Sequence, residues 1–181
     1  NQVCSDNLFS LDASTGTTQW VYEDGLIISV SITVGDGKVY FLETRNASAV
    51  AGTNRRLGTS TWKQDLRLVC LDLTSGVKQW DVPLVINGGT QTVFLMYDVT
   101  SDKLILSSGS GATNYLYGFD PADGASLWNN SAACYKTDHG GSNQHPVIIN
   151  AEIYFTPHVY NPDTGVVVRS DIPTNNSQGC N

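Results

Sequence analysis

A short pattern occurs three times in this chain, and a fourth, altered copy follows near the C-terminus. Each copy places Gly four residues after Asp and Trp four residues after Gly, as in LFSLDASTGTTQW at residues 8–20. The three full copies are Asp12/Gly16/Trp20, Asp72/Gly76/Trp80 and Asp120/Gly124/Trp128, and the altered copy is Asn161/Gly165/Arg169. Successive copies stand 60, 48 and 41 residues apart. This spacing predicts an array of repeated supersecondary units, such as the blades of a propeller or the coils of a solenoid.

The pattern predicts two strands joined by a tight turn. Small and apolar residues alternate before each Asp, which is typical of a half-buried strand. Asp accepts hydrogen bonds from backbone amides two residues further on, and Gly takes the positive φ that the turn requires. Trp ends the second strand and offers a large ring to bury. A Trp repeated in every unit predicts a spacer between neighbouring sheets, and small residues two positions before Asp (Ser10, Cys70 and Gly118) allow close contact.

Further strand pairs precede each later copy, so that one unit has four antiparallel strands. The segments 28–34, 92–99 and 145–150 are each followed by a turn and a second apolar strand, at 35–43, 100–108 and 150–157. No long segment has helical periodicity, so an all-β chain is expected. The predicted organisation is a half unit at 3–24, full units at about 26–83, 91–131 and 143–172, and a tail at 173–181.

From about Leu8 to Arg169, the three in-register copies resemble the tryptophan-docking motif of PQQ-like β-propellers, the quinoprotein-type repeat family. The resemblance implies four-stranded antiparallel blades arranged around an axis. WD40 propellers are the structural alternative, but the Gly-His signature of that repeat is absent from this sequence.

Blade number raises a question of closure. Propellers close with about four to eight blades, whereas this sequence predicts three and a half. Open edges leave backbone groups unpaired. We therefore expect either a fragment of a larger ring or a chain that closes with other chains, and the half unit at 3–24 favours a fragment.

Composition excludes some classes of partner. Ten Lys and Arg against seventeen Asp and Glu give a net charge of −7, which disfavours nucleic acid and anionic membranes as partners. No apolar run approaches the ~20 residues of a membrane-spanning helix. Abundant Ser, Thr, Asn and Gly favour an exported protein that is extracellular, periplasmic or on the cell surface. A disulfide between Cys134 and Cys180 would suit such a compartment, and three glycosylation triplets begin at Asn46, Asn129 and Asn175.

The segment at about 45–65 is the first candidate binding element. It connects two strands of the first full unit and holds Arg55, Arg56 and Trp62 in an otherwise acidic chain. One interpretation is a binding loop for an anionic or planar partner. The other, which we favour, is a surface insertion with one anchoring Trp.

The connection at 135–146 is the second candidate. It contains Asp138, His139 and His145, and His158 follows near the start of a strand in the same unit. Imidazole and carboxylate groups suit zinc, copper or iron. The alternative, which we favour, is that these are hydrogen-bonding residues at the ends of strands. Both candidate segments are expected on one face, where the connections vary in length.

The enzymes of this family set the functional alternative. Catalytic PQQ dehydrogenases, which the blades resemble, carry an adjacent Cys-Cys pair over the cofactor and Glu, Asn and Asp around calcium. This sequence has no Cys-Cys pair, no assignable carboxylate set and no Gly-x-Ser-x-Gly elbow. We therefore predict a non-catalytic exported scaffold that binds or assembles other protein chains or the remainder of a longer chain. The alternative is a segment of a PQQ-dependent dehydrogenase, with PQQ and calcium held in blades outside this sequence.

Overall fold

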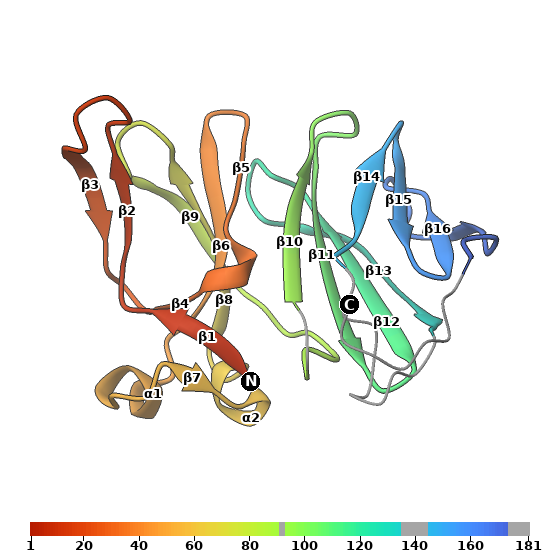
Figure 1. Ribbon diagram of the computed structural model, residues 1–181, viewed down its shortest axis with the longest axis horizontal. Coiled ribbons are helices and arrows are strands. Elements are labelled where there is room, and N and C mark those ends of the chain that lie inside the picture. The colour runs from red at the N-terminus through yellow and green to blue at the C-terminus, as the bar shows by residue number, and fades with distance from the viewer. Residues whose placement is uncertain (91–92, 135–144, 174–181) are drawn as a thin grey trace. The chain divides into compact units, whose positions relative to one another are not determined.

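The computed structural model describes residues 1–90, 93–134 and 145–173. These residues form two compact units, Asn1–Val85 and Ile86–Asn181, and strands dominate both (Figure 1). Helical structure in the described residues consists of α1 (Ala47–Ala51), α2 (Thr59–Trp62) and the single 3-10 turn η1 (Ser29–Ser31). No helix in this described part has the length and apolar character needed to cross a membrane.

The first unit contains a sheet built from the expected four strands. These strands are β4 (Leu26–Ile28) with β5 (Thr33–Gly35), β6 (Lys38–Thr44), β8 (Leu66–Asp72) and β9 (Lys78–Pro83). All neighbours pair antiparallel, and both β4 and β5 pair with β6. The strand expected at 28–34 is therefore divided in two by η1. Ser31 stabilises this break, because its hydroxyl donates to the Ile28 carbonyl and accepts from the Leu42 amide.

Two short strands extend this sheet beyond its predicted boundary. β1 (Gln2–Ser5) pairs antiparallel with β4 and also with β7 (Arg56–Leu57). Gln2 and Cys4 on β1 are buried, so this strand has one face toward the protein interior. The remaining N-terminal strands, β2 (Leu8–Leu11) and β3 (Thr18–Tyr22), form a separate two-stranded sheet. The half unit expected at 3–24 is thus the hairpin 8–22, and β1 belongs to the adjoining sheet.

The second unit contains two four-stranded antiparallel sheets. The first has the order β10 (Val93–Asp98), β11 (Lys103–Ser110), β12 (Thr113–Phe119) and β13 (Ser126–Ala133). The second has the order β14 (Val147–Ile149), β15 (Glu152–Phe155), β16 (His158–Tyr160) and β17 (Val167–Arg169). The predicted all-β fold of four-stranded antiparallel blades, with three and a half blades in this chain, is confirmed.

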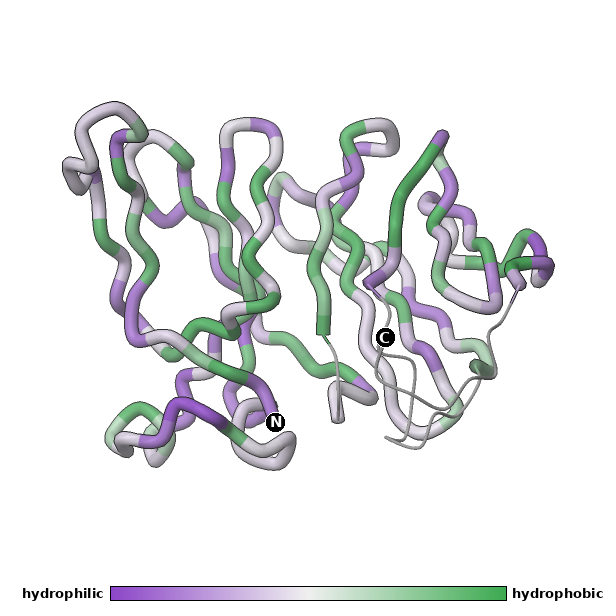
Figure 2. The backbone as a smooth tube through the Cα atoms, in the orientation of Figure 1, coloured by the Kyte–Doolittle hydropathy of each residue, from purple (hydrophilic) through white to green (hydrophobic). Residues whose placement is uncertain are grey.

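Each unit has a hydrophobic core between neighbouring sheets, and apolar residues follow the inner strands (Figure 2). In the first unit, Phe41 of β6 and Val69 of β8 are fully buried and pack with Tyr22 of the β2–β3 hairpin. In the second unit, Ile153 and Phe155 of β15 pack with residues of the preceding sheet. Sheet-to-sheet burial is the main source of stability in such a fold.

The motif turns are alike in all four copies. In each, the Gly amide donates to the carbonyl of the Asp or Asn four residues earlier, at 2.8–2.9 Å. The Gly φ angles are +70° at Gly16, +69° at Gly76, +77° at Gly124 and +67° at Gly165, where other residues are strained. A register shift follows in every hairpin, just before the turn. The altered copy keeps this turn because the Asn161 side chain accepts from the same amides as Asp.

Candidate functional site

The β6–β8 connection, residues 45–65, is a folded element rather than an extended insertion. Asn46 caps α1, since its Oδ1 accepts from the amides of Ser48 and Ala49 at 3.0 and 3.3 Å. Its Nδ2 donates to the Thr61 carbonyl at 3.2 Å and to Gln64 Oε1 at 2.8 Å. One buried side chain thus ties both ends of the connection together, which holds α1 and α2 in fixed positions.

Trp62 anchors the connection from inside. Its side chain has 0 % of its surface exposed. The interpretation of Trp62 as a surface contact for a planar partner is therefore wrong, because the ring is covered by the protein itself. The alternative interpretation of an anchoring Trp agrees with the structure. A lone Trp in a polar segment does not reveal from sequence alone which way the ring points.

The two adjacent arginines have different roles. Arg55 donates from Nε and Nη2 to Asp6 Oδ1 at 2.9 and 2.6 Å, and from Nη1 to the Gly52 carbonyl at 2.7 Å. The hydrogen bond from Arg55 lowers the pKa of Asp6 and raises that of Arg55. Arg55 thus braces the connection against the loop after β1. Arg56 is exposed, and no hydrogen bond or ion pair of its guanidinium occurs among the described residues.

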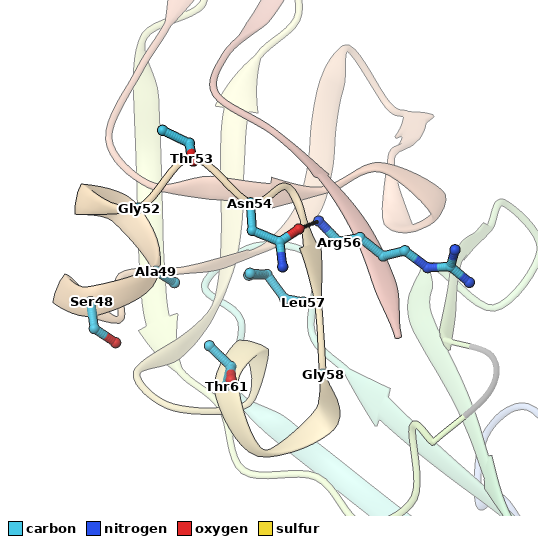
Figure 3. Close-up of a pocket in the computed structure, with 9 residues that line it drawn as sticks. All are labelled: Ser48, Ala49, Gly52, Thr53, Asn54, Arg56, Leu57, Gly58 and Thr61. Atoms are coloured by element: carbon cyan, nitrogen blue, oxygen red, sulfur yellow. Dashed lines mark hydrogen bonds between the residues drawn. The ribbon is translucent and has the colours of Figure 1, made fainter.

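A pocket of about 310 Å³ opens beside the two short helices (Figure 3). Its floor includes the buried side chains of Ala49 and Leu57, and its rim is polar. The only charged lining residue is Arg56, whose side chain extends away from the other labelled residues in Figure 3. The full lining is Ser48, Ala49, Gly52, Thr53, Asn54, Arg56, Leu57, Gly58 and Thr61. This lining suits a small polar or anionic side chain of a partner.

The histidine candidates are only partly within the described residues. Asp138 and His139 lie outside them. His158 has both ring nitrogens in hydrogen bonds, Nδ1 with Ser170 Oγ and Nε2 with the Ala133 carbonyl, each at 2.7 Å. His145 Nδ1 lies 2.6 Å from the Pro146 carbonyl, and its ring lies against Phe94 at 4.3 Å between centroids. Metal binding by His158 would require one of these hydrogen bonds to break. Among the residues described, no three His, Cys, Asp or Glu side chains are grouped to hold a metal.

A charged cluster between the hairpin and the first sheet was not anticipated from the sequence. Asp81 on β9 accepts hydrogen bonds from Arg67 and from Arg45, and Lys78 Nζ lies 3.0 Å from it. Partial burial raises the pKa of Asp81, but the hydrogen bonds from Lys78, Arg67 and Arg45 outweigh this effect and lower it well below its ordinary value. The sequence carries no signal for this cluster, because its members come from separate strands.

Glu43 lies at the centre of the same cluster. Its side chain is fully buried and accepts from the Tyr22 hydroxyl at 2.9 Å and from Arg45 Nε. Burial raises the pKa of Glu43 and that of Tyr22. Because Glu43 and Asp81 both have basic partners, we interpret the cluster as structural.

The cysteines and glycosylation triplets have distinct surroundings. Cys4 and Cys70 are buried, and burial raises the pKa of their thiols to about 11 and about 12. Cys180 lies outside the described residues, so a bridge from Cys134 to Cys180 stays a prediction. Asn46 is buried with its Nδ2 already bonded twice, so this triplet does not present a free amide to a glycan. Asn129 is exposed on β13, and the Asn175 triplet lies outside the described part.

Comparison with known proteins finds relatives by structure alone. No protein-family model matches the chain, and no curated protein matches it. BamB from Moraxella catarrhalis superposes with a TM-score of 0.54 at 16 % identity, covering 98 % of this chain and 50 % of BamB. A europium-containing methanol dehydrogenase gives 0.52 at 13 % identity, covering 92 % of this chain and 38 % of that enzyme.

Another enzyme, quinohemoprotein alcohol dehydrogenase ADHIIG from Pseudomonas putida HK5, gives a TM-score of 0.55 at 14 % identity and covers 91 % of this chain and 32 % of the enzyme. The chain therefore spans half or less of the length of each of these proteins. At such identities the likeness shows the fold, which is that of part of a β-propeller, and leaves the activity open.

Proposed function

We propose that this chain is an exported segment of a PQQ-like propeller, with blades near 26–83, 91–131 and 143–172, that serves as a non-catalytic scaffold. It binds a protein partner through the β6–β8 connection. The observation that carries this proposal is the rigid, braced form of the connection. Asn46, Trp62 and Arg55 hold it in place, while Arg56 stays without an ion pair beside a pocket. A preorganised loop on a rigid sheet loses little entropy when it binds.

The chemistry of this surface favours an acidic group on the partner. Arg56 offers a planar fork of donors that matches a carboxylate or phosphate. The hydroxyl and amide groups of Thr53, Asn54 and Thr61 line the adjacent pocket. A partner loop that places Asp or Glu against Arg56 and a small polar side chain in the pocket would satisfy both features.

A direct test is site-specific photo-crosslinking in the producing organism. A photo-crosslinking residue at position 56 is expected to capture a discrete protein, and the same residue at Thr74, in a motif turn, is the control. Arg56→Glu should weaken binding of the captured protein by about tenfold or more, as expected when like charges are juxtaposed. Capture from position 74 but not from position 56 would assign binding to the motif-turn face instead.

The alternative function is a segment of a PQQ-dependent dehydrogenase. It is favoured by the fold likeness to the two dehydrogenases. The residues of this chain do not fit the group: the described part has no metal-holding trio, and the sequence has no adjacent cysteine pair. No residue is therefore assigned to PQQ or calcium. Reduction of an artificial electron acceptor by the purified parent protein, dependent on added PQQ and calcium, would support this alternative.

A further inference from the structure

Two motif turns receive the indole of the preceding hairpin in the same way. Trp20 lies over Gly76, where an added Cβ would be 2.6 Å from the indole Cγ, and its Nε1 donates to the Leu73 carbonyl at 3.0 Å. Trp128 lies over Gly165, where a Cβ would be 2.3 Å from the ring, and its Nε1 donates to the Pro162 carbonyl at 3.1 Å. In both cases the accepting carbonyl belongs to the residue after the motif Asp or Asn.

The first motif turn has the same geometry but no indole on it. Gly16 donates to the Asp12 carbonyl at 2.8 Å, and Asp12 Oδ1 accepts from the Ser14 and Thr15 amides. The φ angle of Gly16 is +70°, as at Gly76, yet no heavy atom lies within 4 Å of an added Cβ. Ala13 is the exposed counterpart of Leu73 and Pro162. The turn is thus a preformed site for an indole.

An apolar surface adjoins this turn. Phe9, Leu11 and Val21 are 53, 48 and 50 % exposed, and Phe9 lies directly across from Val21 in the β2–β3 hairpin. Their exposure contrasts with the equivalent positions of β8, where Val69 and Leu71 are fully buried against the preceding hairpin. Apolar surface that is covered in one repeat and open in the next indicates an interface.

The second unit repeats this relationship. Tyr160 of β16, the equivalent of Leu11, is 1 % exposed and packs in a cluster with Trp128 of the preceding sheet. In both units, therefore, this face of a motif hairpin is covered by a sheet that supplies a Trp. We name Phe9, Leu11, Val21 and the turn Asp12–Gly16 the acceptor face.

We propose that the acceptor face binds a β-hairpin of the same repeat type that carries Trp at the motif position and comes from polypeptide outside residues 1–181. Its indole stacks on Gly16, donates Nε1–H to the Ala13 carbonyl and covers Phe9 and Leu11. The proposal rests on the proposed role as an assembly scaffold and names one partner surface. The propeller proteins of similar fold are at least twice as long as the part they share with this chain.

A second copy of this chain is a poorer occupant. The hairpin β16–β17, which would pack on the acceptor face if copies joined end to end, has Arg169 in place of Trp. Arg169 is already held by Glu152, with Nη1 and Nη2 at 2.6 and 2.9 Å from its two carboxylate oxygens. It therefore brings neither an indole nor a free donor to Gly16.

The first experiment supplies the occupant by covalent extension of the full chain. A second copy of residues 26–83, which contains Trp80, is joined ahead of Asn1 by a flexible linker, so that docking becomes intramolecular. Amide hydrogen exchange of residues 8–22 is then compared with that of the unextended chain. We expect at least tenfold slower exchange, which is lost when Trp80→Ala is made in the added copy or Phe9→Asp in the acceptor face.

A second experiment does not depend on folding of the added segment. A photo-crosslinking residue replaces Phe9 in the protein as produced by its source, and the crosslinked peptide is identified by mass spectrometry. Attachment to a hairpin with the Asp-x-x-x-Gly-x-x-x-Trp pattern from outside residues 1–181 supports the proposal. Absence of both this attachment and Trp-dependent slowing of exchange overturns it.

The oligomeric state provides the remaining outcome. A dimer of the chain in light scattering that Phe9→Asp dissociates would assign the face to a second copy and overturn the proposal. Crosslinking from position 9 and from position 56 are independent measurements. Failure at Arg56 with success at Phe9 would therefore reject the proposed partner surface on the β6–β8 connection and retain the acceptor face.

Discussion

Trp20 and Gly76 are in direct contact, although 56 positions separate them in the sequence. The indole Cγ and Cδ2 lie 2.6 Å from the place that a Cβ at residue 76 would occupy. The absence of a side chain at Gly76 thus serves two purposes, since it permits a φ of +69° and leaves room for the ring.

This contact predicts unequal effects of the same substitution at two glycines. Gly76→Ala should destabilise the protein by about 2–4 kcal/mol, because backbone strain and a clash with Trp20 add together. Gly16→Ala is the matched control, with nearly the same φ and no atom nearby, and should cost only about 1–2 kcal/mol. Denaturant unfolding of both variants measures the difference. Equal effects would mean that Trp20 does not occupy Gly76 in solution.

The second indole contact predicts a graded loss at Trp128. Trp128→Ala should cost about 2–3 kcal/mol, below the ~3–5 kcal/mol of a fully buried Trp, because this ring is half-buried. Trp128→Phe keeps an aromatic ring on Gly165 and loses the hydrogen bond to Pro162, so about 1 kcal/mol is expected. Thermal and denaturant unfolding test this order. A Phe variant as unstable as the Ala variant would contradict a packing role for the ring.

The ion pairs of Asp81 predict a loss of stability in acid. The native pKa of this carboxyl is lowered, so the contribution of its ionised form is present above the unfolded-state pKa of about 3.9 and is lost as the pH falls through the native pKa. Asp81→Asn should lower stability near neutral pH and flatten this acid dependence. Unfolding free energies measured from about pH 6 downward provide the check.

Asp36→Asn is the control for Asp81. Asp36 pairs with Lys38 but its side chain is 65 % exposed, so its loss should change stability by less than about 0.5 kcal/mol. An unchanged acid profile in Asp81→Asn would show that the cluster does not link folding to pH.

The buried thiols predict slow chemical labelling. With pKa values raised to about 11 and about 12, Cys4 and Cys70 form little thiolate near pH 8, and the protein covers both. Alkylation followed by peptide mass spectrometry should find both thiols unmodified in the native protein and modified after denaturation. Rapid native labelling of Cys4 would indicate that β1 detaches from β4 and β7.

The capping side chain Asn46 predicts a local loss of order. Asn46→Ala removes the cap of α1 and both hydrogen bonds from Nδ2, which should cost about 1–3 kcal/mol. Hydrogen exchange should rise within residues 45–65 more than elsewhere. Asn129→Ala, at an exposed triplet, is the comparison and should leave exchange in that segment unchanged.

The sequence by itself was sufficient to predict the repeat. Alternating apolar residues, the Asp and Gly of each turn and the Trp that follows are local signals, and four-stranded sheets follow from them because turn chemistry and strand period act over a few residues. Local signals also located the β6–β8 connection as the unusual segment. They misassigned β1, whose pairing with β4 and β7 depends on residues up to 55 positions away.

Only the tertiary structure decided the roles of individual side chains. It placed Trp62 inside, bound Arg55 to Asp6 and left Arg56 exposed, although the two arginines are chemically identical neighbours. It also assembled the Asp81 cluster and left Gly16 open while covering Gly76. The physical reason is that burial and pairing depend on which distant segments pack against a residue, and no local pattern in the sequence specifies those neighbours.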